Sequence, residues 1–258
     1  MCTFDKLTII VTASNEKSSL GETLRKLAEL CDPKDIAEVI VFLKSENCSA
    51  KSDYEKTLQD LCFPFPIRSY IQTIPGYAEM FYEAPTLVHS SHFLCIGADL
   101  EMDPDSIPAL IETSKANPEA IVCASKFAKG STREGYGFFH MIAVRFVNFI
   151  VRKIIGSNGT ELFSTVEIHP TKTHFEMNFS SDPRSFYGFT IKQVICGVPY
   201  IEIPTKYVKN NKEKTNFGTF DYLKLTLPLI DAAIRLKIEK IKNDRKNKQE
   251  KKKKKSTL

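Results

Sequence analysis

The chain has 258 residues, of which 42% are hydrophobic and 26% charged, and this length and balance predict a soluble globular protein with one large α/β domain or two small ones. Its net charge of +5 comes from the C-terminal end: residues 235–258 hold twelve Lys or Arg against three Asp or Glu, a local +9, so residues 1–234 carry −4. The folded part therefore lacks the positive excess expected of a nucleic-acid-binding protein.

Strand-like and helical patterns alternate through the first half of the chain. Runs of β-branched and apolar residues predict strands at 7–11, 37–43, 67–71, 92–96 and 120–124. Helices are expected between them, at 20–30 and 54–62, after Gly76 and after Pro104. Because short connections join these elements, we predict a doubly wound, mostly parallel α/β sheet flanked by helices.

The second half of the chain contains an unusually apolar helix, expected at 136–155. A membrane span needs about 20 nearly uncharged residues, so we favour a buried or membrane-facing amphipathic helix here. The polar residues that interrupt the run are His140, Arg145, Asn148, Arg152 and Lys153. A short strand at 198–203 and a long helix over 217–242 complete the predicted fold.

No internal repeat and no Gly/Ser/Pro-rich linker divides the chain. We therefore predict a single domain over residues 1–242. Residues 243–258 are rich in lysine and have almost no apolar residues to bury, so they are predicted to form a disordered tail.

The segment most informative about function runs from residue 96 to Pro104. A strand leads into Asp99, Glu101 and Asp103, and a helix begins at Pro104. In an open α/β sheet, ligands bind beyond the carboxyl ends of the strands, and acidic side chains at alternate positions there can bind a divalent cation that neutralises a diphosphate. For Asp103 we favour an N-terminal helix cap, and for Asp99 a functional role.

Four segments in register carry motifs of a known enzyme family. Residues 8–16 match an opening strand with a Pro-x-x-Asn-Glu turn, and residues 98–104 match an Asp-Ala-Asp-Leu-Gln-x-x-Pro metal motif. Residues 124–139 match a Gly-Ser-Arg-Tyr-x-x-Gly…Gly-Trp loop with its helix, and residues 202–205 a late Glu-Val-Pro-Ile strand. Over nearly the whole predicted domain, the chain resembles glycosyltransferase family 2, of the dolichyl-phosphate-mannose-synthase-like type, which implies a GT-A-type fold.

The resemblance also implies an activity and roles for individual residues. It implies a hexosyltransferase that uses a nucleotide-sugar donor, with Asp99 and Glu101 holding Mg²⁺ or Mn²⁺ on the diphosphate. Glu161 would be the catalytic base for a hydroxyl acceptor such as a glycan, whereas a polyprenyl-phosphate acceptor would need no base. The residues implied to bind the donor are Thr12, Asn15, Glu16, Gly76, Ala98 and Lys126. For Asn15 and Glu16, a capping turn before the next helix is an equally good interpretation.

Several positions differ from the family pattern. Gly97 replaces the first metal-site Asp, Glu167 stands at an Arg position, and Asn210 replaces a late phosphate-binding Arg. Lysines that could supply positive charge near this last position are Lys209, Lys212 and Lys214. These losses favour an alternative, a catalytically impaired GT-A protein that binds nucleotide sugars or scaffolds a partner. A nucleotidyltransferase ranks third, because no Gly-rich loop with Lys or Arg follows the first strand.

The cysteines and the termini bear on where the protein works. The seven cysteines are odd in number and lack CxxC spacing, as expected of a reduced cytoplasmic chain. No N-terminal stretch has the pattern of a secretory signal. The lysine-rich tail could attach the protein peripherally to the anionic cytosolic face of a membrane, where a polyprenyl phosphate would lie.

Overall fold

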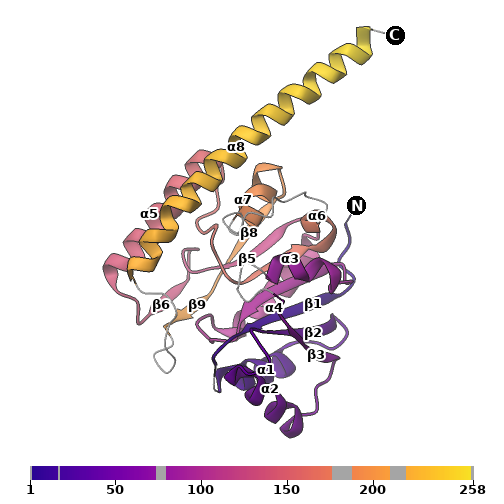
Figure 1. The fold of residues 1–258 in the computed structure, drawn as a ribbon, viewed down its shortest axis with the longest axis vertical. Helices are drawn as coiled ribbons and strands as arrows, with labels where there is room; N and C mark the ends of the chain where they lie inside the picture. The colour runs from indigo at the N-terminus through magenta and orange to yellow at the C-terminus, as the bar shows by residue number, and fades with distance from the viewer. Residues whose placement is uncertain (1, 17, 74–79, 176–187, 210–218, 257–258) are drawn as a thin grey trace.

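A seven-stranded sheet with the strand order β3-β2-β1-β4-β7-β5-β8 lies at the centre of the molecule, and a second sheet pairs β6 with β9 (Figure 1). The structure is a computed structural model that describes residues 2–16, 18–73, 80–175, 188–209 and 219–256. The strands are β1 (Leu7–Ala13), β2 (Ile36–Leu43), β3 (Ile67–Ile71), β4 (His92–Gly97), β5 (Ile121–Ser125), β6 (Thr132–Glu134), β7 (Glu167–Pro170), β8 (Tyr200–Pro204) and β9 (Lys206–Val208).

Neighbouring strands of the large sheet run parallel, except that β7 is antiparallel to both β4 and β5. This confirms the predicted mostly parallel sheet. β1 lies between β2 and β4, with Val11 opposite Val41 on one side and Ile96 on the other. Strands of this kind are covered on both faces, which explains why β1 is a nearly continuous apolar run.

Helices cover both faces of the sheet, so alternate residues of one strand enter different cores. Leu7, Ile9 and Val11 face a core shared with α1, α2 and α4, whereas Ile10 faces a second core shared with α3 and α7. A third core joins α5, α7 and α8. The helices are α1 (Ser19–Leu30), α2 (Ser49–Asp60), α3 (Met80–Glu83), α4 (Ile107–Ala116), α5 (Phe138–Ile155), α6 (Thr171–Phe175), α7 (Gly188–Ile195) and α8 (Thr219–Ser256), with 3₁₀ turns at Ala84–Thr86 and Pro104–Ser106.

The sequence pattern does not predict β7, because two of its buried residues are polar. The Glu167 carboxylate accepts hydrogen bonds from Thr190 Oγ1 at 2.6 Å and from the Tyr200 hydroxyl at 2.8 Å. His169 Nε2 lies 3.1 Å from the same carboxylate. These contacts satisfy side chains that would otherwise be costly to bury. Because the buried residues of β7 are partly polar, its sequence lacks the apolar pattern by which a strand is recognised.

The C-terminal helix is longer than the sequence predicts. α8 runs without a break from Thr219 to Ser256, through the lysine-rich stretch that the sequence assigns to a disordered tail. Lys and Glu are good helix formers, and an ion pair between Lys240 and Asp244, four residues apart, supports the extension. Figure 1 shows this part of α8 projecting beyond the rest of the molecule. The domain boundary at residue 242 and the disorder of the tail in solution stay predictions.

α5 lies where the apolar helix was predicted, and a glycine flanks it at each end. Gly137 precedes the helix, and Gly156 follows it with a φ of 80°, the left-handed conformation in which glycine commonly ends helices. None of the helices in the described ranges is both long enough and apolar enough to cross a bilayer.

The packing of α1 against the sheet gives a test of the fold. Leu24 on α1 is fully buried, whereas Leu58 on α2 is 37% exposed. Leu24→Ala should lower the free energy of unfolding by about 2–5 kcal/mol, because it leaves a cavity in the core. Leu58→Ala should change it by less than about 0.5 kcal/mol. Urea unfolding of the two variants measures both values, and an equal loss in both would contradict the assigned packing.

Candidate functional site

The ends of β1 and β4 meet at one edge of the sheet. Thr12, near the end of β1, pairs with Gly97, the last residue of β4. Beyond that pair, the Ala98 N–H donates to the Thr12 carbonyl at 3.0 Å. The acidic segment that follows Ala98 therefore begins where ligands of open α/β sheets bind, and the structure brings together the sequence-predicted residues Thr12, Ala98 and Asp99.

Three carboxylates interact at this edge. Asp99 accepts a hydrogen bond from the Glu101 N–H at 3.2 Å. The residue as a whole is exposed. The protein packed around it and the negative charges of Glu101 and Glu16 nevertheless raise the pKa of Asp99 to about 6. A cation placed here would interact favourably with all three groups.

The backbone is unusual between Asp99 and Glu101. Leu100 has a φ of 56°, in the left-handed region where a leucine is rarely found. Such conformations persist only where the surrounding structure holds them, and they concentrate at functional sites. The absence of a side chain at Gly97 also affects Asp99. A Cβ atom at residue 97 would lie 3.2 Å from Asp99 Oδ1. The glycine that replaces the family's first Asp thus leaves room for the Asp99 carboxylate.

The residues present fit a divalent cation that binds together with a diphosphate. Among the described residues, no group of three or more His, Cys, Asp or Glu side chains could hold a metal ion. Mg²⁺ is usually bound by one or two carboxylates together with substrate phosphates, rather than by a complete protein cage. Asp99 and Glu101 could supply the carboxylates, and the remaining ligands would be phosphate oxygens and water.

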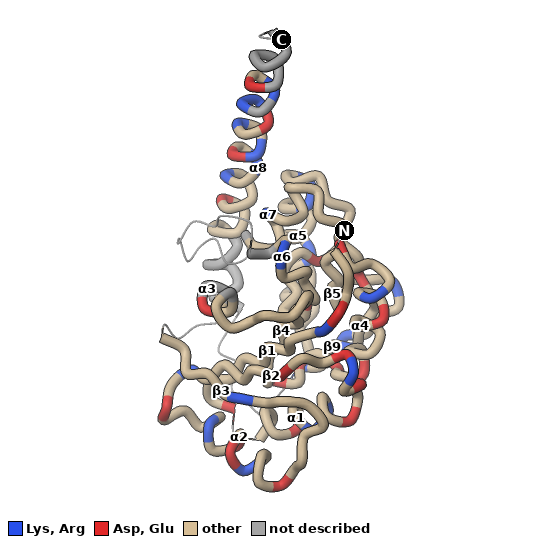
Figure 2. The backbone as a smooth tube through the Cα atoms, turned by 90° about the vertical axis from the view of Figure 1, so that its right-hand side faces the viewer, with Lys and Arg blue, Asp and Glu red and all other residues tan. Residues whose placement is uncertain are grey.

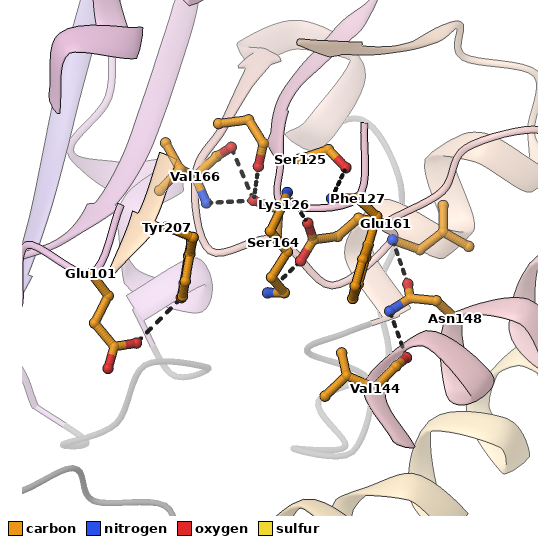
Figure 3. Close-up of polar contacts among 12 residues, drawn as sticks. Glu101, Ser125, Lys126, Phe127, Val144, Asn148, Glu161, Ser164, Val166 and Tyr207 are labelled. Atoms are coloured by element: carbon orange, nitrogen blue, oxygen red, sulfur yellow. Dashed lines mark hydrogen bonds and ion pairs between the residues drawn. The ribbon is translucent and has the colours of Figure 1, made fainter. Parts of the chain in front are cut away.

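Tyr207 on β9 connects the acidic segment to the rest of the site (Figure 3). Its hydroxyl donates to Glu101 Oε2 at 3.3 Å, and Lys126 Nζ lies 4.7 Å from the centroid of its ring. The backbone reinforces this contact, because the Val208 N–H donates to the Glu101 carbonyl at 2.7 Å. Sequence reasoning missed Tyr207; the only signal was its position shortly after the Glu-x-Pro strand.

Lys126 and Glu161 form an ion pair next to Tyr207. Lys126 Nζ lies 2.5 Å from Glu161 Oε1, and the Lys126 N–H donates to Glu161 Oε2 at 2.7 Å. The Glu161 residue is only 1% exposed. Burial raises the pKa of its carboxyl group, and the charge of Lys126 acts in the opposite direction. The structure therefore brings the predicted base and the predicted phosphate-binding lysine together, but it encloses the base.

Hydrogen bonds to β8 fix the loop that carries Glu161. The Glu202 carboxylate accepts from the N–H groups of Thr160 and Glu161, each at 2.7 Å. On the other side, the Leu162 N–H donates to Asn148 Oδ1 at 2.7 Å, which ties the loop to α5 (Figure 3). Glu161 is thus held by its backbone as well as by Lys126.

Two further residues, one just before α5 and one in its first turn, border the site and were not identified as site residues from sequence. Tyr136 packs against Tyr207 with a centroid distance of 5.4 Å, and the His140 ring stacks on Tyr136 at 5.8 Å. Burial and the positive charges of Lys126 and Lys209 lower the pKa of His140. His140 has no ligand-like spacing to another histidine, so no pattern marked it.

The remaining sequence predictions have different outcomes. Asp103 caps the turn at Pro104, because its carboxylate accepts from the Asp105 N–H at 3.1 Å, as predicted. Ser18 occupies the N-cap position of α1, so neither Asn15 nor Glu16 does. Asn15 is exposed just beyond β1, and the Glu16 carboxylate accepts from the Ser14 N–H. Predicted residues that lie outside the described ranges are Gly76, Asn210, Lys212 and Lys214.

Comparison with known sequences decides the family. The profile described as "Glycosyl transferase family 2" matches residues 8–165, more than half of the chain. The chain belongs to glycosyltransferase family 2. The family 2 prediction is therefore confirmed, while the dolichyl-phosphate-mannose-synthase-like subtype stays a prediction. A search among curated proteins finds no match.

Solved structures confirm the fold of this family 2 protein. It is similar to glucosyl-3-phosphoglycerate synthase from Mycobacterium tuberculosis in complex with Mn²⁺, uridine diphosphate and glucosyl-3-phosphoglycerate, with a TM-score of 0.65 and 11% identity over 90% of this chain and 80% of that one. It is also similar to the crystal structure of a mycobacterial protein, with a TM-score of 0.66 and 12% identity over 90% of this chain and 74% of that one. At this identity the likeness shows the fold alone, which is the predicted GT-A fold.

The ion pair predicts a pH-dependent loss of stability. Lys126→Met leaves Glu161 buried without its cation, so its folded-state pKa should rise further above the ordinary value of 4.5. The unfolded chain then ionises first as the pH rises, and the variant loses stability from about pH 4.5 upward, reaching about 3–5 kcal/mol. Urea unfolding at several pH values measures the loss. The exposed Lys129→Met is the control; equal pH profiles for the two variants would refute the pairing.

Proposed function

We propose that this family 2 protein is a hexosyltransferase that uses a nucleotide-sugar donor and a divalent cation. The observation that carries the proposal is the contact between Tyr207 and both Glu101 and Lys126, since it joins a carboxylate of the acidic segment to a lysine at one edge of the sheet. A diphosphate needs both kinds of group, carboxylates to hold its cation and a cation of the protein to meet its oxygens.

In this proposal the donor diphosphate lies between the acidic segment and Lys126. Asp99 and Glu101 would hold Mg²⁺ or Mn²⁺, which when bound supplies positive charge for the departing phosphate. The Lys126 ammonium has three N–H donors, so it can contact Glu161 and still donate to a phosphate oxygen. Thr12 lies near the end of β1, and Asn15 and Glu16 follow that strand. We place the nucleoside of the donor next to these three residues.

We assign Glu161 a positioning role toward Lys126, because its carboxylate is enclosed and paired. A role as catalytic base stays the alternative, and it would require the carboxylate to become accessible to an acceptor hydroxyl. A lipid-phosphate acceptor is already an anion and needs no base. If Glu161 is the base, a hydroxyl acceptor such as a glycan is favoured. If it only positions Lys126, a lipid-phosphate acceptor is favoured.

Asp99→Asn tests the metal site. The substitution keeps the shape of the side chain and removes its charge, so Mn²⁺-dependent affinity for UDP or GDP should fall by about tenfold or more. Thermal-shift titrations with each nucleotide, with and without Mn²⁺, measure the change. Asp105→Asn, an exposed carboxylate of the same segment, should bind like the parent. Unchanged affinity in Asp99→Asn would remove Asp99 from the site.

Glu161→Gln separates the two roles of Glu161. If Glu161 positions Lys126, both turnover of the nucleotide sugar and affinity for the nucleotide diphosphate should fall, because the lysine loses its charged anchor. A base would lower turnover by about 10²-fold or more and leave the affinity unchanged. Calorimetric titration and a donor-consumption assay on the same preparation distinguish them. A parent protein that binds the donor without consuming it would instead support the catalytically impaired alternative.

We also propose that the protein works in the cytoplasm, attached peripherally to the cytosolic face of a membrane by its lysine-rich C-terminal end. The support is the local excess of basic residues over 235–258, since each basic residue near an anionic surface contributes about 1 kcal/mol and salt weakens the attraction. A chain ending at residue 241 should sediment less with anionic vesicles at low salt than the full chain. Equal sedimentation would exclude the tail as the anchor.

A further inference from the structure

One face of α5 presents large apolar side chains to solvent. Phe138, Ile142, Phe146 and Phe149 follow each other at intervals of four, four and three residues, which places them on one side of the helix. Phe138 is 73% exposed and Phe146 is 60% exposed. The opposite side of α5 is buried in the core shared with α7 and α8. Contiguous exposed apolar surface of this kind marks an interaction site.

Basic side chains border this apolar face. The Arg152 guanidinium and the Lys153 ammonium lie 5.8 and 5.7 Å from the centroid of the Phe149 ring. Arg145 lies between Ile142 and Phe149 in sequence and is exposed. α5 contains no Asp or Glu. We call the four apolar and three basic residues together the α5 ridge.

α8, which packs next to α5, also exposes apolar side chains. The two helices pack side by side, as Figure 1 shows, with Val151 of α5 and Ala233 of α8 buried in the shared core. The exposed apolar residues of α8 are Leu227, Ile234, Ile238 and Ile241, and their spacing also places them on one side of the helix. Beyond them, Figure 2 shows Lys and Arg interspersed with Asp and Glu along the projecting end of α8, where the basic residues are in excess.

We propose that the α5 ridge lies in the interface of an anionic phospholipid membrane. A helix with aromatic and aliphatic side chains on one face and Arg or Lys at its borders lies in the plane of the interface, with its apolar face in the acyl region. The aliphatic parts of Arg and Lys extend along the apolar surface and bring their charges to the headgroups. Anionic headgroups complement the three cations and the absence of acidic residues on α5.

A second copy of the chain complements this face poorly. In a symmetric dimer the same patch faces itself, so the cations of Arg145, Arg152 and Lys153 would be enclosed against a patch whose helix has no acidic residue to pair with them. Enclosing charges without partners disfavours association. An anionic lipid surface supplies the missing negative charges, which is why we assign the ridge to lipid.

Membrane contact at the ridge would bring the candidate site to the headgroup level. Phe138 is the first residue of α5, and Tyr136 just before it packs against Tyr207 of the site. The inference needs no assumption about the transfer reaction. Its failure and the failure of the proposed function are therefore distinguishable.

A tryptophan at the ridge tests this directly, because the chain has no tryptophan of its own. Full-length Phe146→Trp is mixed with vesicles of phosphatidylcholine and phosphatidylserine that contain brominated acyl chains. The emission should shift to shorter wavelength and be quenched, because the ring enters the acyl region. Leu58→Trp on α2, at an exposed leucine away from the ridge, should show neither change. Absence of quenching in Phe146→Trp, or equal quenching in both variants, would overturn the proposal.

Partitioning into vesicles then measures how much the ridge contributes to membrane binding. Phe146→Ser/Phe149→Ser should lower the vesicle partition coefficient by roughly tenfold or more, because two apolar side chains leave the acyl region. Among these variants, Arg145→Glu/Lys153→Glu should bind anionic vesicles most weakly. Lys34→Glu, at an exposed lysine away from the ridge, should bind them like the parent. Circular dichroism and urea unfolding of each variant check that it is folded.

Three results would contradict the proposal. The first is equal partitioning of the serine variant and the parent, which would assign all binding to the basic tail. The second is failure of the parent itself to bind anionic vesicles at low salt. The third is a concentration-dependent dimer in analytical ultracentrifugation that the serine substitutions dissociate, which would make the ridge an interface between two copies.

Discussion

The contact between Lys126 and Glu161 holds together the elements around the candidate site. Lys126 follows β5, Glu161 lies in the loop before β7, and that loop is fixed in turn by Glu202 of β8 and Asn148 of α5. A buried ion pair is retained only where geometry and further hydrogen bonds offset its desolvation. Here the backbone N–H of Lys126 donates to the Glu161 carboxylate, and the side chains of Glu202 and Asn148 hold the backbone of the loop that carries Glu161. The lysine can therefore face Tyr207 without being free to move away.

The parts of the structure that depend on apolar patterns could be predicted from the sequence, and the rest could not. β1 and β4 are buried apolar runs, so their shared edge and the position of Asp99 follow from the pattern alone. β7 buries Glu167 and His169, and its polar contacts come from residues distant in sequence. Tyr207 enters the site through a ring contact with Lys126. Contacts of this kind depend on tertiary structure, and no local spacing records them.

The departures from the family pattern are less damaging in the structure than in the sequence. Gly97 leaves space that the Asp99 carboxylate approaches, so the position of the lost acidic residue still serves the remaining one. The strained Leu100 lies between the two remaining carboxylates. Glu167, which stands at the position of a family Arg, is buried in β7, and its carboxylate accepts hydrogen bonds from Tyr200 and Thr190. That position has become part of the core.

The single antiparallel strand also bears on how the chain folds during its synthesis. β4 pairs on one side with β1, made early, and on the other with β7, made much later, while β5 waits for both β7 and β8. As the ribosome releases the first half, β4 therefore has an unpaired edge, and such edges are prone to pair with other chains. β7, which covers this edge, is made only in the second half of the chain, and β8 joins β5 later still. A nascent chain halted before β7 would therefore leave the edge of the apolar β4 open to pairing with other chains.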